Sequence, residues 1–418
     1  MFRLSYPKNK FKFVLLLWGL SRLLIFVIML LVTPAFAPRI WNDILSLAVL
    51  THWDGVWYQQ IATTGYHYVA DGKAHPVAFF PLFPLISRGI MTFGLPFAIA
   101  GALVNNLAFL GALLVIYGWM QERYEVEIAR WTIAILVWCP LSLYVSVTYT
   151  EGLFLLLSSL ALRAFEQRRY RQAALFGALT TATRLPGILL VPTFLIVAWK
   201  EKRAWVTYLV VLVTASGFLA YSSYCAIRFG DPLVFIHIQR AFGQRAAAGF
   251  DSFHWGHTFL YGIVGRFDGN TGMLKNPLQP IQVALIGGAG ALLWQNRTRL
   301  RTSLFVLANT SLILGWWLLW GDGLIKVAMV FGGGYLLWHW RKQLSLTVLT
   351  YGVGSLLLVL FSGAVGSNDR YTYGSVAWSI SMGLLLAQYQ PWSLSILAFC
   401  GIVLSIFASQ FALNMWIS

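Results

Sequence analysis

The sequence predicts an all-α integral membrane protein, a polytopic helical bundle with about 11 to 13 transmembrane helices. Hydrophobic residues make up 58% of the chain and charged residues 11%, whereas soluble domains carry about 25% charged residues. Apolar runs of about 20 residues recur from residue 13 to residue 416, and each is long enough to cross a hydrocarbon core of about 30 Å as a helix. These runs lack the alternation of barrel strands, so helices are the expected spanning elements.

The first apolar run, residues 13–32, follows a basic segment, which is also how a secretory signal begins. It is longer than the apolar region of a signal peptide, and no small-x-small cleavage site follows it cleanly. We therefore expect a retained span that rises from the cytoplasm. The polar stretch after it, about residues 33–95, becomes a large external loop with short amphipathic helices. A second external loop is expected at about residues 228–279.

Two pairs of short or tilted helices are expected between these loops. The first pair fits residues 131–162, with an external turn near 140–150. The second pair fits residues 172–199 and is interrupted at 184–187, because proline and glycine disfavour a continuous helix. No repeat, linker or low-complexity tract divides the chain, so residues 1–418 are expected to form one domain.

The net charge of +16 invites a nucleic-acid interpretation, but its distribution indicates a membrane instead. Cations cluster in short segments between the apolar runs, which is the pattern of cytoplasmic loops facing anionic headgroups. The clusters are residues 163–171, 200–203, 297–301 and 341–342. We expect membrane lipids as their partners and no nucleic acid.

The first external loop contains an aromatic and polar segment, residues 51–66, with one acid to explain. Asp54 lies between Trp53 and Trp57, and partial desolvation at the membrane surface would raise the pKa of its carboxyl toward the range of a general base. Aromatic faces beside it suit the C–H face of a sugar. Alternatively, the aromatic residues belong to an interfacial belt and Asp54 is the N-cap of the following helix. Capping and catalysis are compatible.

Metal and disulfide chemistry have little support in the sequence. His52, His67, His75 and Asp71 match no standard ligand spacing, so solvated loop histidines are expected and no metal site. The three cysteines lie inside apolar runs without pairing or metal spacing: Cys139, Cys225 and Cys400.

Several polar side chains fall near the external ends of apolar runs, where ionisable groups are functional candidates because burying them is unfavourable. They are Glu151, Arg184, Asp231, Gln239, Arg240, Asp369 and Arg370. External arginines run against the positive-inside bias. A lipid phosphate would supply the missing counter-charge through bidentate hydrogen bonds. The alternative is that the arginines pair with Glu151, Asp231 or Asp369.

The order of several motifs resembles the PIG-V family of mannosyltransferases, whose eukaryotic members add the second mannose of the glycosylphosphatidylinositol anchor. The resemblance covers most of the chain. Its motifs are the WDG of residues 53–55, GY of 65–66, FFPLFP of 79–84, YTEGLF of 149–154, TRLPG of 183–187, GDPL of 230–233 and RY of 370–371. Two departures stand out: Gly152 replaces a family serine, and Leu185 with Pro186 replaces small polar residues. We therefore expect acceptor recognition to differ from that of the eukaryotic enzymes.

The resemblance implies an inverting GT-C type glycosyltransferase that takes mannose from a polyprenyl-phosphate-linked donor. By that analogy Asp54 is the catalytic base. The departing phosphate also needs stabilisation, for which Arg184 and Arg370 are the candidates, with Glu151 orienting one of them or binding the acceptor. No nucleotide-binding or DxD motif is present, and no cofactor is expected beyond the lipid-linked co-substrate. The substrate-binding candidates are Trp53, Phe80, Glu151, Arg184, Asp231, Gln239, Arg370 and Tyr371.

A secondary transporter is the alternative from another class. Transporters show paired repeats and charges near the bilayer midplane, whereas the charges here gather at one face without a repeat. For the enzyme we expect a bacterial inner membrane, with a cytoplasmic N-terminus and a periplasmic active site; in a eukaryote the site would face the endoplasmic reticulum lumen. The sequence leaves open whether the acceptor is a lipid, a glycan or a protein.

Overall fold

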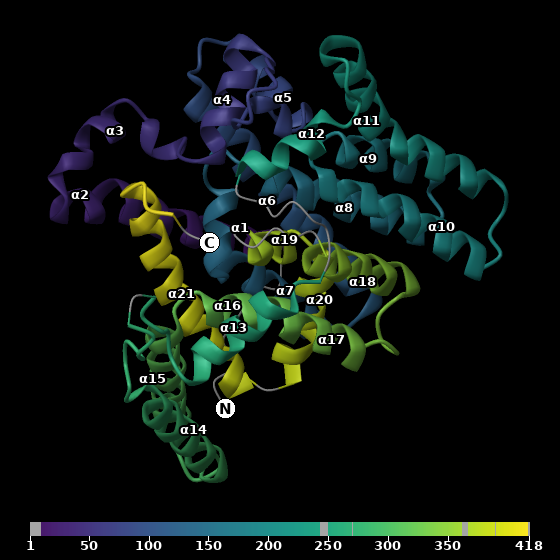
Figure 1. Cartoon of the computed structure of the whole chain (residues 1–418). Coiled ribbons are helices and arrows are strands. Elements are labelled where there is room, and N and C mark those ends of the chain that lie inside the picture. The colour runs from purple at the N-terminus through teal and green to yellow at the C-terminus, as the bar shows by residue number, and fades with distance from the viewer. Residues whose placement is uncertain (1–9, 243–249, 270, 362–366, 389, 417–418) are drawn as a thin grey trace.

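The computed structural model of the chain describes residues 10–242, 250–269, 271–361, 367–388 and 390–416. This part of the chain is helical throughout, and its only extended pairing is an isolated bridge between Phe267 and Leu274. Figure 1 shows the helices packed around a centre formed by α1, α6, α7 and α20. The predicted all-α architecture is therefore confirmed.

The α-helices have the following bounds: α1 Lys10–Val27, α2 Thr33–Phe36, α3 Trp41–Leu45, α4 Asp54–Thr64, α5 Leu82–Met91, α6 Phe97–Arg123, α7 Val126–Trp138, α8 Glu151–Glu166, α9 Tyr170–Thr181, α10 Leu190–Lys200, α11 Val206–Phe229, α12 Val234–His237, α13 Ser252–Ile263, α14 Gln279–Gln295, α15 Thr302–Trp320, α16 Gly323–Val327, α17 Gly333–His339, α18 Leu346–Phe361, α19 Asn368–Tyr373, α20 Val376–Gln388 and α21 Gln390–Ala412. Segments of 3-10 helix occupy Pro38–Ile40, Ala48–Leu50, Pro76–Ala78, Pro140–Val145, Leu185–Leu189 and Ile238–Phe242, and π-helical turns occupy Ile28–Val32 and Ala328–Gly332.

Five helices in the described residues are long and apolar enough to cross a membrane. They are Lys10–Phe36, Phe97–Arg123, Val206–Phe229, Thr302–Trp320 and Gln390–Ala412. Shorter apolar helices accompany them, at Leu82–Met91, Leu185–Lys200, Leu346–Phe361 and Val376–Gln388. The multi-pass character is confirmed, and the count of 11 to 13 spans stays a prediction.

The first span runs further than the apolar run that predicted it. It continues without a break from Lys10 to Phe36, so the external stretch begins four residues later than residue 33. Pro34 lacks a backbone N–H and would interrupt a regular helix. A π-helical turn, Ile28–Val32, precedes this proline, and the Thr33 hydroxyl donates to the Ile28 carbonyl at 2.8 Å. The Ile28 carbonyl also accepts the Thr33 backbone N–H, so the helix widens to a π turn immediately before the proline.

Both predicted helix interruptions are confirmed. Between α7 and α8 the chain forms the 3-10 helix Pro140–Val145, and between α9 and α10 it forms the 3-10 helix Leu185–Leu189. A proline stands in the first two positions of each segment, where its missing N–H leaves no helical hydrogen bond unmade. The chain thereby turns within about 12 residues between the ends of neighbouring helices.

The predicted external loops also consist of short helices. The first holds α3, α4 and α5, and α5 is amphipathic, with Phe83 buried and Leu85 exposed. The second holds α12 and α13, and its residues 243–249 and 270 lie outside the described part of the chain. These loops bring α4 beside α5 and α6 at one end of the bundle.

Three of the basic loops, those of residues 163–171, 200–203 and 341–342, lie at the other end of α8. Arg163, near the last turn of α8, pairs with Glu122 at the end of α6. Arg203 donates to the Phe165 carbonyl at 2.6 Å. Tyr124 donates to the carbonyl of residue 343, next to the basic pair at 341–342, at 2.9 Å. A 16-residue helix is about 24 Å long, so this basic end is well separated from Glu151 at the start of α8.

Candidate functional site

The candidate site contains two carboxylates, each on the first residue of a helix, and both contact Arg370. Asp54 is the first residue of α4 and Glu151 is the first residue of α8. Helix N-termini carry a partial positive charge that favours anions. The N-cap of α4 is Trp53, whose backbone has φ 55° and ψ −118° and whose side chain makes no capping hydrogen bond. The interpretation of Asp54 as a helix cap is therefore wrong, and its carboxylate is available for other contacts.

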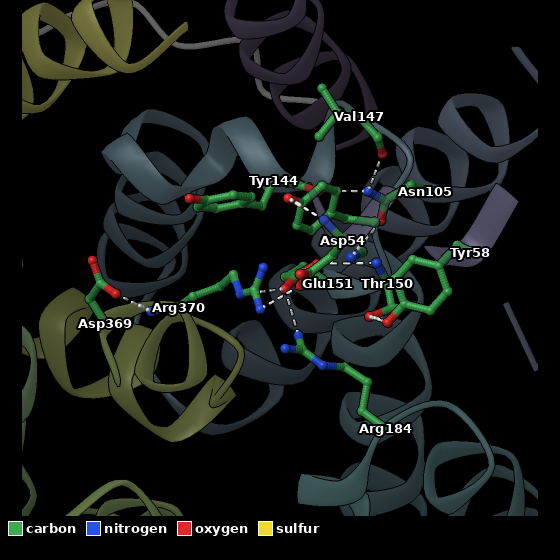
Figure 2. Close-up of polar contacts among 12 residues, drawn as sticks. Asp54, Tyr58, Asn105, Tyr144, Val147, Thr150, Glu151, Arg184, Asp369 and Arg370 are labelled. Carbon is green, nitrogen blue, oxygen red and sulfur yellow. Dashed lines mark hydrogen bonds and ion pairs between the residues drawn. The ribbon is translucent and has the colours of Figure 1, made fainter. Parts of the chain in front are cut away.

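Two arginines close on these carboxylates, as Figure 2 shows. Arg370 Nη2 lies 2.7 Å from Asp54 Oδ2, and Arg370 Nε lies 3.4 Å from Glu151 Oε1. Arg184 Nη1 lies 2.7 Å from the same Glu151 oxygen. We call Asp54, Glu151, Arg184 and Arg370 the ion-pair cluster. Pairing of arginines with Glu151 was one of the predicted alternatives, whereas the bond between Arg370 and Asp54 was not predicted.

The ion-pair cluster is electrically neutral and deeply placed. The side chain of Glu151 is 1% exposed, that of Arg184 9% and that of Arg370 10%, whereas Asp54 reaches 20%. A buried charge is unfavourable unless a group of opposite charge lies beside it, and here each arginine contacts at least one carboxylate. Asp54 is the most accessible member, so a reacting group can reach it first.

Aromatic rings enclose the guanidinium groups. Arg370 lies 5.3 Å from the ring centres of both Tyr144 and Tyr149. Arg184 lies 5.3 Å from the ring centre of Tyr371. Tyr149 also receives a hydrogen bond from the backbone N–H of Asp54 at 3.3 Å. Cation–π contacts of this kind hold the arginines while leaving some guanidinium N–H groups free for a ligand.

Asn105 of α6 fixes the loop that carries Glu151. Its Nδ2 donates to the carbonyls of Tyr144 and Val147 at 2.7 and 2.8 Å, and its Oδ1 accepts the Gly152 N–H at 2.7 Å. A Cβ on Gly152 would lie 2.3 Å from the Asn105 carbonyl oxygen. Glycine replaces the family serine here because α8 begins in contact with α6, so this departure has a packing reason.

The segment before Asp54 is tied to the same loop. The Thr148 N–H and hydroxyl both donate to the Leu50 carbonyl, at 3.1 and 2.9 Å. A Cβ on Gly55 would lie 2.4 Å from Thr148 Oγ1, so only glycine allows this approach. His52 Nδ1 lies 2.8 Å from the Phe411 carbonyl of α21. Asp54 is thus positioned by contacts with segments far away in the sequence.

Arg22 is a buried residue that belongs to none of the sequence motifs. Its side chain lies inside the first span, is 4% exposed and donates to the Ser142 carbonyl at 3.1 Å and to the Ser146 hydroxyl at 2.5 Å. It also lies 5.3 Å from the ring centre of Phe109. In the described part of the chain its hydrogen-bond partners are carbonyl and hydroxyl oxygens. An arginine within an apolar run was the signal that could have revealed it.

The other predicted site residues divide into two groups. Trp53 and Tyr371 lie beside the ion-pair cluster. Trp53 directly precedes Asp54, and the ring of Tyr371 faces the Arg184 guanidinium. Phe80 does not join it: this side chain is 2% exposed and packs among Tyr221 and Phe235. Asp231 and Gln239 lie in the α12 region. Asp231 binds His237 at 2.7 Å, and Gln239 donates to the Phe235 carbonyl at 3.0 Å.

Within the described residues, no group of three or more histidine, cysteine, aspartate or glutamate side chains is placed to hold a metal ion. His75 Nε2 lies 2.8 Å from Asp71 Oδ1, and hydrogen bonds from His75 and from the Lys73 N–H hold the pKa of Asp71 below its usual value. The three cysteines are buried and free: Cys139, Cys225 and Cys400.

Comparison with known proteins gives a family match over residues 21–226, to the model described as Mannosyltransferase (PIG-V). A curated relative, GPI mannosyltransferase 2 of Drosophila pseudoobscura pseudoobscura, is 30% identical over 160 residues. That alignment covers 34% of this chain and 34% of the relative, so the chain matches about a third of the relative's length.

Two solved structures are similar over most of the chain. The Archaeoglobus fulgidus oligosaccharyltransferase, in complex with zinc and sulfate, is 13% identical with a TM-score of 0.45, and the match covers 94% of this chain and 53% of that one. ArnT from Cupriavidus metallidurans, bound to undecaprenyl phosphate, is 13% identical with a TM-score of 0.37, and the match covers 88% of this chain and 78% of that one.

Proposed function

Through residues 21–226 the chain belongs to the PIG-V mannosyltransferase family, and from this premise we propose that it is a membrane-embedded inverting glycosyltransferase of the GT-C type. It transfers mannose from a polyprenyl-phosphate-linked donor to a lipid, glycan or protein acceptor on the non-cytoplasmic face. The observation that carries the proposal is the ion-pair cluster: the most accessible carboxylate, Asp54, adjoins two arginines that are held by aromatic rings.

The reaction needs a base and a site for the leaving phosphate. Asp54 accepts the proton of the acceptor hydroxyl while that oxygen attacks the anomeric carbon of the donor. The bond from the anomeric carbon to the phosphate oxygen breaks, and the phosphate leaves with the electron pair. Arg370 and Arg184 stabilise its negative charge in a site of low exposure, where such stabilisation is strongest. Attack from the face opposite to the phosphate inverts the anomeric configuration.

The contacts also suggest how donor binding prepares the base. Arg370 Nη2 lies 2.7 Å from Asp54 Oδ2, so the guanidinium occupies one of the carboxylate oxygens that would take the proton of the acceptor. A phosphate that binds the guanidinium in a bidentate manner competes with Asp54 for the same N–H groups. The donor would thereby release Asp54 for the acceptor. Glu151 contacts both arginines and keeps them in place during this exchange.

The remaining candidates are assigned supporting roles. Trp53 and Tyr371 adjoin the ion-pair cluster and are proposed to contact the substrates. Phe80 is buried in an aromatic core, so we assign it to holding the first external loop on α11 and α12. Asp231 and Gln239 would contact only parts of a substrate that extend beyond the reacting sugar.

The arrangement of charge supports the proposed orientation. Three basic loops lie at the end of α8 opposite to Glu151, and basic loops face the cytoplasm. We therefore assign the ion-pair cluster to the periplasmic side of a bacterial inner membrane, or to the endoplasmic reticulum lumen in a eukaryote, with the N-terminus cytoplasmic.

The donor class is tested with membranes that contain the wild-type chain and a lipid extract of the host as acceptor. Mannose labelled in polyprenyl-phosphate-mannose should appear in the acceptor fraction, whereas label supplied in a nucleotide sugar should not, once polyprenyl-phosphate-mannose synthesis is blocked. Transfer from the nucleotide sugar alone would contradict the proposed donor. Flux of a small solute across liposomes that contain the purified chain, without sugar transfer, would favour the transporter instead.

A further inference from the structure

A small cavity adjoins the ion-pair cluster on the side of α19. Arg370 lines it together with Asp369, Tyr144, Trp53 and Trp416. Trp53 and Trp416 meet edge to face, with ring centres 4.8 Å apart. In this structure the cavity has room for about one water molecule, and Trp416 on its wall is 51% exposed. A shift of this one exposed side chain would enlarge the cavity.

Asp369 is the unexplained group of this cavity. Its side chain is 1% exposed, and its Oδ1 accepts the backbone N–H of Arg370 at 2.9 Å. Its Oδ2 is buried and has no hydrogen-bond partner in the described part of the chain. Buried polar atoms almost always have a partner, and a carboxylate oxygen can accept hydrogen bonds only. An ionised Oδ2 therefore calls for a hydrogen-bond donor, and no side chain or backbone N–H of the described residues supplies one.

The lining indicates the chemistry of that donor. A phosphate would be repelled by Asp369, while a purely apolar group would leave its Oδ2 unsatisfied. A pyranose ring satisfies both parts of the cavity, because its hydroxyls donate to a carboxylate and its C–H face packs on aromatic rings. Trp53, Trp416 and Tyr144 supply such rings. The cavity is thus suited to a neutral polyol next to an arginine.

We propose that Asp369 and this aromatic wall form the subsite for the sugar ring of the donor, and that Asp369 determines which hexose is transferred. The proposal rests on the proposed function, because it uses Arg370 as a ligand of the donor phosphate. In a polyprenyl-phosphate sugar the ring is attached directly to the phosphate. A phosphate on Arg370 therefore places the ring beside the residues that share the cavity with Arg370.

The test measures binding of three ligands to purified protein: polyprenyl phosphate, polyprenyl-phosphate-mannose and polyprenyl-phosphate-glucose, which differs from the mannose donor at one hydroxyl. In the wild type, the donor that carries the preferred sugar should bind more tightly than bare polyprenyl phosphate. We call this difference in affinity the sugar-dependent gain. Asp369→Asn should reduce that gain at least about tenfold, because a hydrogen bond to a charged acceptor is replaced by a neutral one. Its affinity for bare polyprenyl phosphate should stay unchanged.

Trp416→Ala is the second variant, because an exposed residue after the last helix can be replaced without unfolding the bundle; Met415→Ala, 48% exposed, is its matched control. Trp416→Ala should reduce the sugar-dependent gain and Met415→Ala should not. The subsite is overturned if both Asp369→Asn and Trp416→Ala keep the full gain, or if they weaken bare polyprenyl phosphate by the same factor. Absence of sugar transfer by the wild type would instead contradict the proposed function and leave the binding comparison valid.

Discussion

Arg370 links the two carboxylates of the site by forming an ion pair with each of them. It contacts Asp54 and Glu151 at once, and Arg184 approaches Glu151 from the other side. Neither the sequence spacing nor the apolar pattern indicated the bond between Arg370 and Asp54, because the two residues lie in distant motifs. The cap assignment of Asp54 was wrong for a local reason: Trp53, at positive φ, occupies the cap position.

The geometry of the guanidinium leads to a first prediction. Arg370→Lys keeps the positive charge but loses the planar fork that can hold a phosphate with two parallel hydrogen bonds. We expect sugar transfer to fall by about 10- to 100-fold in kcat/KM, since each hydrogen bond to a charged group contributes about 1.5 to 3 kcal/mol. Steady-state assays over a range of donor concentrations measure this. Arg341→Lys, in an exposed basic loop, is the control, and an equal effect of both variants would contradict the role of Arg370.

Arg22 supports the site from within the first span. Arg22→Met removes its hydrogen bonds to the loop of Ser142 and Ser146 and leaves the Ser142 carbonyl without this donor. We expect a loss of stability of about 2 to 4 kcal/mol, because charged buried hydrogen bonds disappear, and a parallel loss of transfer. Thermal unfolding in detergent, compared with Arg22→Lys, measures it. A melting temperature unchanged in Arg22→Met would show that the arginine does not hold the loop.

At the scale of elements, the helix breaks were predictable and the helix contacts were not. The length of residues 131–162 predicted the turn before α8, and proline and glycine at 184–187 predicted the turn before α10. The structure has 3-10 helices at both places. The contact of α8 with α6 depends on Asn105, which sits in an apolar helix with no motif around it. Phe80 belonged to a recognised motif, yet its surroundings, α11 and α12, could only be known from the fold.

Gly152 provides the prediction for this scale. Gly152→Ser restores the family residue but places a Cβ 2.3 Å from the Asn105 backbone oxygen, so α8 must move away from α6. We expect a loss of stability of about 1 to 3 kcal/mol from overpacking, and a loss of activity because Glu151 moves with the helix. Gly19→Ala, which meets nothing within 4 Å, is the matched control and should be neutral or slightly stabilising. An active, fully stable Gly152→Ser would contradict the packing explanation.

At the scale of the whole molecule, three basic loops and the ion-pair cluster lie at opposite ends of α8. Composition and apolar runs were sufficient to predict a helical membrane protein, and five described helices are long enough to span a bilayer. The number of crossings could not be fixed from the sequence, because several apolar helices are shorter than a bilayer is thick. The clustering of charge around Asp54 and Glu151 fits an enzyme site better than a transport pathway at the bilayer midplane.

The proposed orientation predicts which loops reagents can reach. Val69→Cys, 60% exposed in the first external loop, should react with a membrane-impermeant thiol reagent in intact cells. Arg168→Cys, exposed in the first basic loop, should react only after the membrane is opened. The three native cysteines are buried and provide a low background. The reverse pattern of labelling would place the ion-pair cluster in the cytoplasm.

Asp54→Asn is the most direct test of the central claim that Asp54 is the catalytic base. Asparagine keeps the shape and an oxygen that can accept from Arg370, but it cannot take the proton of the acceptor. Transfer from polyprenyl-phosphate-mannose should fall by about 100-fold or more in protein that remains folded, because general-base catalysis contributes about 100- to 10,000-fold. Asp43→Asn, a second acid of the same loop outside the ion-pair cluster, should keep the wild-type rate. A wild-type rate in Asp54→Asn would contradict the mechanism.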